Sequence, residues 1–370
     1  MTQQKTEQTF VIGIFGDNFE LRKIIGQALG APSSKSDIQV YDRLDNSLGY
    51  IFSAYTPIDY PEKLKPFLQI LNLTDIHILS IDLETGLNAA IGEILIAMDL
   101  VKQLKIVKQL IVIGNINEKT EWKLPEIRKN IKKVIETTSL RDVNIIEIKE
   151  KEDFQLMKKR IIELGLELIK EKNQNQAKND DRIVILIDHV FPVKGIGTVA
   201  LGIVKEGILH AGQMLELVDG TNNSRKVIIR SIQKQDRDYK EAYEGDRIGV
   251  ALKGINPDEV SRDNILATPG IFHGVNELVA ELHVSPFYKP KSGKIIPNDG
   301  DQYHAISFLK MVPLKIIDGN EIEPGQNGIV KFELDKPLYH DGRGLKGFIV
   351  KLNRFQNKLR IVGIFFQKID

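Results

Sequence analysis

The sequence contains no cysteine and a single tryptophan among its 370 residues. The absence of cysteine excludes disulfide bonds, thiol nucleophiles and cysteine-ligated metal centres. The seven histidines are scattered and lack the spacing of metal ligands. We therefore expect no metal site.

An excess of charge of one sign and long apolar runs are also lacking. The chain has 51 Lys and Arg against 50 Asp and Glu, a net charge of +1. No global field favours nucleic acid or a membrane surface, so any RNA contact must come from local basic patches. No apolar run approaches the ~18 residues of a membrane span, and the polar N-terminus lacks the apolar core of a signal peptide. We expect a cytoplasmic protein that binds neither membrane nor DNA.

The N-terminal part alternates strand-like and helix-like segments. Apolar runs typical of strands buried on both faces occur at 10–15, 50–55, 76–82, 110–114 and 144–148. Apolar residues with helical spacing occur at 21–29, 61–72, 87–104, 125–138 and 153–172. This alternation predicts a mostly parallel sheet covered by helices, and we place this α/β domain at residues 1–170.

The rest of the chain is rich in short strands. The polar segment 171–181 predicts a flexible linker. Short β-rich runs separated by turns with Gly, Pro, Asn and Asp then predict two antiparallel β-barrels, at 182–272 and 273–370. The strands of the second barrel are expected at 277–285, 303–317, 327–339, 344–352 and 359–366.

The segment 182–270 resembles domain 2 of the elongation factor Tu and elongation factor 1-alpha family, which includes the selenocysteine-specific factor. DHVFPVKGIGTVALGIVKEGILHAG, at 188–212, matches D-x-V-F…G-x-G-T-V…G-x-V-x-x-G…G. GDRIGVALKGI at 245–255 and RDNILATPG at 262–270 match two later family patterns. The order of the N-terminal elements and RIVG at 360–363 resemble the rest of the family. The resemblance implies a P-loop-GTPase-like α/β domain followed by two antiparallel β-barrels.

The resemblance fails where the family holds phosphates. A P-loop reads G-x-x-x-x-G-K-[ST], because its Lys reaches the β- and γ-phosphates and its hydroxyl binds Mg²⁺. Here Gly16 remains, but Leu21, Arg22 and Lys23 replace the second Gly, the Lys and the hydroxyl residue. The first switch loop is expected to be shortened to residues 30–37.

The family's other nucleotide motifs have changed as well. Its D-x-P-G-H segment has Tyr55 for the metal-linked Asp, Ile58 for the γ-phosphate-sensing Gly and Asp59 for the water-positioning His. The guanine-reading [NT]-K-x-D corresponds to Gly114–Asn115–Ile116–Asn117, which lacks the Asp carboxylate that pairs with guanine. Because catalysis of this type depends on positioning and electrostatics, we predict a pseudo-GTPase that binds no nucleotide and needs no cofactor.

The resemblance also indicates where RNA would bind. In the family the acylated end of tRNA lies against domain 2, and the Arg of R-x-x-[IV]-L-A-x-P-G lies near the tRNA 5′ end. This implies contacts at Arg262 and at the turn that contains Gly195, Gly197, Thr198 and Val199. The alternative is that these residues only maintain the barrel, because glycines also occur at barrel corners.

Two basic groups add candidate RNA contacts. One lies on the outer face of the predicted helix 125–138, whose buried stripe should be Ile127, Ile131, Val134 and Ile135. The other lies in a loop of the second barrel. An exposed charged face is more often only solvated, so both interpretations stay open. The candidates are Arg128, Lys129, Lys132 and Lys133, and Lys289, Lys291 and Lys294.

The sequence favours an elongation-factor-like translation protein that has lost GTP binding and binds the ribosome, tRNA or other translation proteins. A regulatory or hibernation-type factor fits better than a tRNA carrier, because family members release their cargo through GTP hydrolysis. An active elongation factor with divergent motifs is one alternative, which nucleotide binding would reveal. A protein-interaction scaffold without RNA contact is another, which sedimentation with ribosomes would test.

Overall fold

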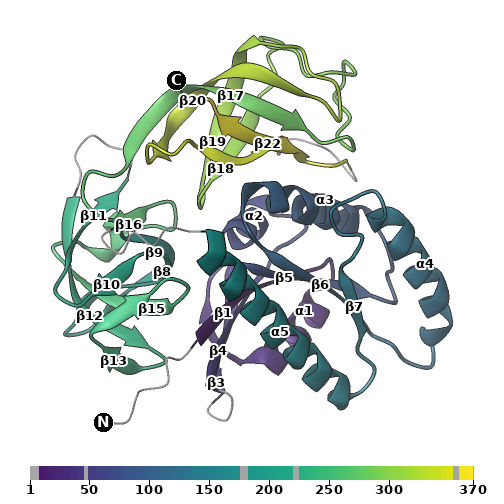
Figure 1. The fold of residues 1–370 in the computed structure, drawn as a ribbon, viewed down its shortest axis with the longest axis horizontal. Coiled ribbons are helices and arrows are strands. Elements are labelled where there is room, and N and C mark those ends of the chain that lie inside the picture. The colour runs from purple at the N-terminus through teal and green to yellow at the C-terminus, as the bar shows by residue number, and fades with distance from the viewer. Residues whose placement is uncertain (1–7, 46–48, 176–181, 220–224, 353–357, 370) are drawn as a thin grey trace. The chain divides into compact units, whose positions relative to one another are not determined.

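The computed structural model describes residues 8–45, 49–175, 182–219, 225–352 and 358–369 (Figure 1). The chain divides into two compact units, Met1–Ala177 and Lys178–Asp370. One apolar core cluster lies in unit 1, and unit 2 has two, one in each half of its chain. Among the described residues, none of the helices is both long and apolar enough to cross a membrane.

Unit 1 is built around a 7-stranded sheet with the order β2-β3-β4-β1-β5-β6-β7. Its central strands pair in parallel, as their continuous apolar runs predict, whereas β2 and β3 add an antiparallel edge. The strands are β1 (Gln8–Phe15), β2 (Ala31–Lys35), β3 (Ile38–Asp45), β4 (Tyr50–Pro57), β5 (Ile76–Asp82), β6 (Lys108–Gly114) and β7 (Asn144–Glu147).

Helices follow the parallel strands and supply the rest of the core. Alternate residues of β1 (Phe10, Ile12 and Ile14) share one buried cluster with apolar residues of α1 and α5. Asn18 and Asn88 start α1 and α3, because each side chain accepts a hydrogen bond from a backbone amide three residues on. The helices are α1 (Phe19–Leu29), α2 (Leu64–Leu73), α3 (Ala89–Leu104), the 3₁₀ turn η1 (Glu121–Lys123), α4 (Leu124–Ile135) and α5 (Lys151–Asn175).

Three expectations for unit 1 need correction. The segment 30–37 is not a loop, because most of it forms strand β2 at the edge of the sheet. Val134 is 45% exposed and does not belong to the buried stripe of α4. The predicted linker 171–181 begins inside α5, which continues to Asn175, and residues 176–181 lie outside the described part of the chain.

Unit 2 begins with an antiparallel barrel. Its strands pair in the order β11-β16-β8-β9-β15-β12, and pairing of β11 with β12 closes the ring. β13 (Arg237–Tyr239) extends the sheet, while β10 (Ile208–His210) and β14 (Glu241–Tyr243) form a separate pair. The ring strands are β8 (Val184–Val193), β9 (Gly197–Glu206), β11 (Met214–Val218), β12 (Arg225–Lys234), β15 (Arg247–Lys253) and β16 (Ile265–Ala267).

A second closed barrel, β17-β20-β19-β18-β21-β22, completes the unit. The apolar run at 303–317 is two strands rather than one, because the chain reverses at Phe308, where φ is 49°. The strands are β17 (His273–Val284), β18 (Tyr303–Ser307), β19 (Lys310–Gly319), β20 (Asn327–His340), β21 (Lys346–Val350) and β22 (Ile361–Gln367).

An ion-pair network joins the two barrels within unit 2. Arg182 Nε lies 2.9 Å from Glu206 Oε2, and Arg182 Nη2 lies 2.6 Å from Asp341 Oδ2. Arg343 contacts the same two carboxylates, at 2.5 Å and 2.6 Å. Burial tends to raise the pKa of Asp341, but hydrogen bonds and the charges of Arg343 and Arg182 outweigh it and hold this pKa below its ordinary value. Two arginines and two acids thus form one network across the junction.

Candidate functional site

The start of α1, directly after the loop where the family binds phosphate, holds a buried arginine. Arg22 is 0% exposed and donates hydrogen bonds to the carbonyl oxygens of Gly16, Pro57 (2.9 Å) and Ile58 (3.2 Å). Burial lowers the pKa of Arg22 to about 10, so the side chain stays protonated at neutral pH. The position that carries the phosphate-binding Lys of the P-loop therefore binds carbonyl oxygens of this chain.

Leu21 closes the neighbouring space between α1 and the end of β6. It is 4% exposed and packs on Gly114 so closely that a Cβ on that glycine would lie 2.5 Å from a Leu21 methyl carbon. The glycine of a P-loop leaves room for the backbone to approach a phosphate, whereas this leucine is part of the core.

Asp82, at the end of β5, organises a polar cluster in the same region. Its carboxylate is 1% exposed and accepts hydrogen bonds from the Asn18 side chain, from Asn115 Nδ2 at 2.7 Å and from the Glu84 amide at 2.8 Å. Asn115 has a left-handed backbone with φ of 57°. The residue at the Lys position of the guanine-reading motif is therefore held by an internal carboxylate.

The remaining altered positions also have local partners or are buried. Lys23 lies 3.1 Å from Glu20, and Asp59 lies 2.7 Å from Lys63. Tyr55 is fully buried in β4. Asn117 caps the turn that precedes η1 and accepts a hydrogen bond from the Lys119 amide at 2.9 Å.

The 3₁₀ turn η1, which follows, carries the chain's single tryptophan. Trp122 is 71% exposed, and its indole N–H donates to the Lys119 carbonyl at 3.0 Å. The Lys123 ammonium lies 5.8 Å from the ring centroid.

In the first barrel, the predicted RNA-binding turn connects β8 to β9. Gly195 and Gly197 have φ of 80° and 102°, and a Cβ on either would meet no atom within 4 Å. Backbone conformation, rather than space, therefore requires glycine here. Thr198 is buried and donates its hydroxyl to the Ile255 carbonyl at 2.7 Å, while Val199 follows it in β9, half-buried.

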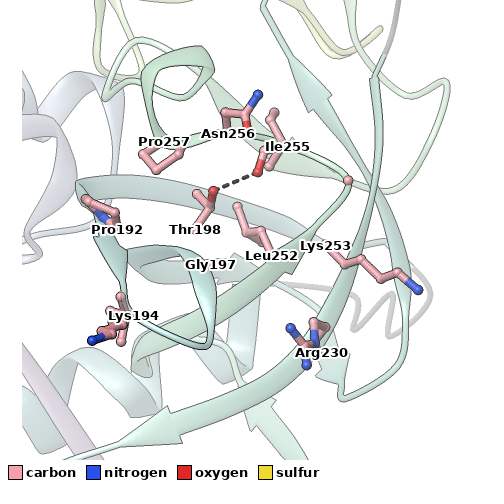
Figure 2. A pocket seen from close by; sticks show the side chains of 12 residues that line it. Pro192, Lys194, Gly197, Thr198, Arg230, Leu252, Lys253, Ile255, Asn256 and Pro257 are labelled. Atoms are coloured by element: carbon pink, nitrogen blue, oxygen red, sulfur yellow. Dashed lines mark hydrogen bonds between the residues drawn. The ribbon is translucent and has the colours of Figure 1, made fainter.

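A pocket opens beside this turn (Figure 2). Gly197 and Thr198 line it together with Lys194, Arg230 and Lys253, which come from the turn, from β12 and from β15. The Arg230 guanidinium donates to the Ile196 carbonyl at 3.1 Å, which fixes it near the turn. The three basic residues are far apart in sequence and come together only through the pairing of β12 with β15 and of β15 with β9. None of these three residues was among the RNA contacts predicted from the sequence.

Arg262 does not line this pocket. It is half-buried, and its Nε donates to the Asp188 carbonyl at 3.1 Å. The Asp188 carboxylate is itself buried, 3.2 Å from Arg247 and 2.7 Å from His189. These contacts favour the alternative in which Arg262 maintains the barrel.

The two predicted basic groups lie on different units. On α4, Arg128 is paired with Glu147, while Lys129, Lys132 and Lys133 are exposed. In the second barrel, Lys294 is paired with Glu321, while Lys289 and Lys291 of the same loop are exposed. Among the described residues, His, Asp and Glu side chains form no group of three or more that could hold a metal ion.

Comparison with known proteins agrees with this architecture. Residues 197–266 match the family model of elongation factor Tu domain 2. The chain is 28% identical over 355 residues to uncharacterized protein MJ0325 of Methanocaldococcus jannaschii, covering 95% of this chain and 97% of that protein. It is 27% identical over 332 residues to the selenocysteine-specific elongation factor of the same organism, covering 85% of this chain and 68% of that factor.

Solved structures share the fold. The translation elongation factor SelB of Methanococcus maripaludis, in complex with the GTP analogue GppNHp, matches with a TM-score of 0.79 and 21% identity, over 98% of this chain and 79% of that one. Its apo form matches with a TM-score of 0.78 and the same identity, over 98% and 80%. Residues 197–266 are thus similar to elongation factor Tu domain 2, and the whole chain is similar to members of the translational GTPase superfamily. Its three-domain architecture matches that of elongation factor Tu and SelB.

Proposed function

We propose that this protein is an elongation-factor-like translation protein that has lost GTP binding. In this proposal it acts by binding tRNA or the ribosome, as a regulatory or hibernation-type factor. One contrast carries the proposal. The region corresponding to the nucleotide site is filled by the chain's own side chains, whereas the first barrel keeps an open basic pocket.

Loss of nucleotide is supported by three separate contacts. Arg22 binds carbonyl oxygens where the family binds phosphate, and Leu21 fills the neighbouring space. Asn115, in the segment that corresponds to the guanine-reading motif, donates a hydrogen bond to Asp82. A nucleotide would have to displace all three contacts, including hydrogen bonds of a buried charge.

RNA binding is supported by the charge and position of the pocket. Lys194, Arg230 and Lys253 line the pocket beside a turn that the family resemblance assigns to the tRNA end. Such groups attract phosphates, and the half-exposed Ile196 and Phe191 offer apolar surface to a base or ribose. A tRNA carrier would need GTP hydrolysis to release its cargo, which favours a regulatory factor.

The test compares two lysines of the same barrel in the full-length protein. Lys253→Ala removes a charge from the pocket, and Lys226→Ala removes an exposed charge that does not line it. Binding of deacylated tRNA and cosedimentation with ribosomes would be measured across a range of salt concentrations. Lys253→Ala should weaken association by about tenfold and reduce its salt dependence, since one phosphate contact is lost.

Lys226→Ala should have a smaller effect on the strength of association and on its salt dependence. Equal binding by the parent and the Lys253→Ala variant at every salt concentration would remove the pocket from the proposed function. Failure of the parent protein to associate with tRNA or ribosomes would favour the scaffold alternative.

A further inference from the structure

The Arg22 guanidinium joins two segments that lie far apart in the sequence. Its two terminal nitrogens donate to the carbonyl of Gly16, after β1, and to those of Pro57 and Ile58, at the end of β4. The centroid of the Phe19 ring lies 5.5 Å from the guanidinium carbon. Three acceptors from two segments therefore surround one buried cation.

The three carbonyl oxygens that accept hydrogen bonds from Arg22 form a cradle, and its chemistry is that of a cation-binding site. Carbonyl oxygens present the negative ends of their dipoles, whereas phosphate-binding loops present N–H groups. Desolvation lowers the pKa of Arg22 to about 10, opposed by the nearby Tyr60, Asp17 and Glu62. The guanidinium is therefore charged at neutral pH, and its hydrogen bonds are charge-assisted.

We propose that Arg22 is a built-in guanidinium ligand that holds the segment after β4 permanently against the loop after β1. A nucleotide switch changes conformation because its ligand binds and leaves, which shifts the population of two states. A ligand that is part of the chain cannot leave, so its effective concentration stays high. Unit 1 would then keep one conformation without nucleotide. This inference does not depend on RNA binding.

The proposal implies that the cradle binds guanidinium even when the arginine is removed. Arg22→Ala leaves the three carbonyl oxygens without their donor and leaves space for a small planar cation. Free guanidinium or methylguanidinium should enter this space at millimolar concentrations, far below those that unfold proteins. Leu29→Ala provides the matched control, because Leu29 is a fully buried residue of the same helix with no polar partner in this cradle.

Thermal unfolding of the full-length protein, followed by circular dichroism, measures the effect. Both variants should lower Tm by roughly 5–10 °C, since each removes a fully buried side chain. Millimolar methylguanidinium should restore at least half of the lost Tm in Arg22→Ala, while it leaves the Tm of the parent and of Leu29→Ala unchanged. Urea at the same concentration should not raise the Tm of either variant. Equal responses of the two variants to methylguanidinium would overturn the proposal.

Hydrogen exchange gives a second measurement on a milder variant. The Ile58 amide donates to the Asp37 carbonyl at 3.0 Å, so its exchange reports whether the segment after β4 stays in place. Arg22→Lys keeps the charge but cannot reach both segments with a planar fork. Exchange of the Ile58 amide should be at least tenfold faster than in the parent, with β5 and β6 unchanged. If the parent and Arg22→Lys exchange this amide equally, Arg22 does not hold the segment, even where Arg22→Ala fails to fold.

Discussion

At the scale of single residues, the altered nucleotide motifs predict that GTP and GDP do not bind. Leu21 and Arg22 occupy the site with packed or hydrogen-bonded side chains. Isothermal titration calorimetry at micromolar nucleotide, with and without Mg²⁺, should therefore show no heat of binding. A micromolar dissociation constant for GDP would contradict this and restore the active-GTPase alternative.

The same measurement applies to a repaired loop. Leu21→Gly, Arg22→Lys and Lys23→Thr together recreate the P-loop pattern. We expect the repaired protein to bind GDP poorly, because Asn117 still stands where the family's guanine-reading Asp would be. Tight binding by this variant would mean that the P-loop changes alone abolished the site.

Arg262 offers a prediction about stability. Its Nε–H donates to the Asp188 carbonyl, and a hydrogen bond from a charged group contributes about 1.5–3 kcal/mol. Arg262→Ala should therefore lower the free energy of unfolding by about 2 kcal/mol in urea titrations, with Arg237→Ala, an exposed residue of β13, as a comparison. An unchanged unfolding midpoint together with weaker tRNA binding would instead favour the RNA contact.

At the scale of elements, the β8–β9 hairpin depends on two glycines. Gly197 has φ of 102°, which L-residues with a Cβ rarely adopt. Gly197→Ala should destabilise the protein by about 1–2 kcal/mol in urea titrations, although its Cβ would meet no atom. Gly92→Ala, in α3, is the contrasting substitution and should be stabilising by up to about 1 kcal/mol, because the backbone there is helical. Equal effects of the two substitutions would show that the turn is not strained.

Elements were predictable from the sequence where burial on both faces leaves a continuous apolar run, as in β1 and β5. The edge strand β2 was missed, because an edge strand needs little burial and its sequence APSSK carries no apolar pattern. The hairpin at Phe308 was missed for the opposite reason, because apolar residues continue through the turn. Lys194, Arg230 and Lys253 could not be grouped, because strand pairing and register are not readable from residue spacing.

At the scale of the whole molecule, the ion pairs between the barrels make unit 2 sensitive to acid. The pKa of Asp341 is lower in the folded protein than its ordinary value of about 3.9. Its stabilising contribution is therefore complete above about pH 4–5 and is lost as the pH falls through the folded pKa. Asp341→Asn should lower Tm at pH 7, and the difference from the parent should shrink below about pH 4. A difference that stays constant across this range would show that the carboxylate charge does not join the barrels.

The exposure of Trp122 decides how all these stabilities can be measured. Its ring already meets water in the folded protein, and the chain has no second indole. Unfolding therefore changes the surroundings of the only strong fluorophore very little, and emission would understate or miss the transition. The same position makes the ring a local optical reporter, since a quencher or a partner that approaches the turn after β6 would change its emission without any change in fold. In a chain without cysteine, one engineered thiol elsewhere could be labelled as a selective energy acceptor for this single donor.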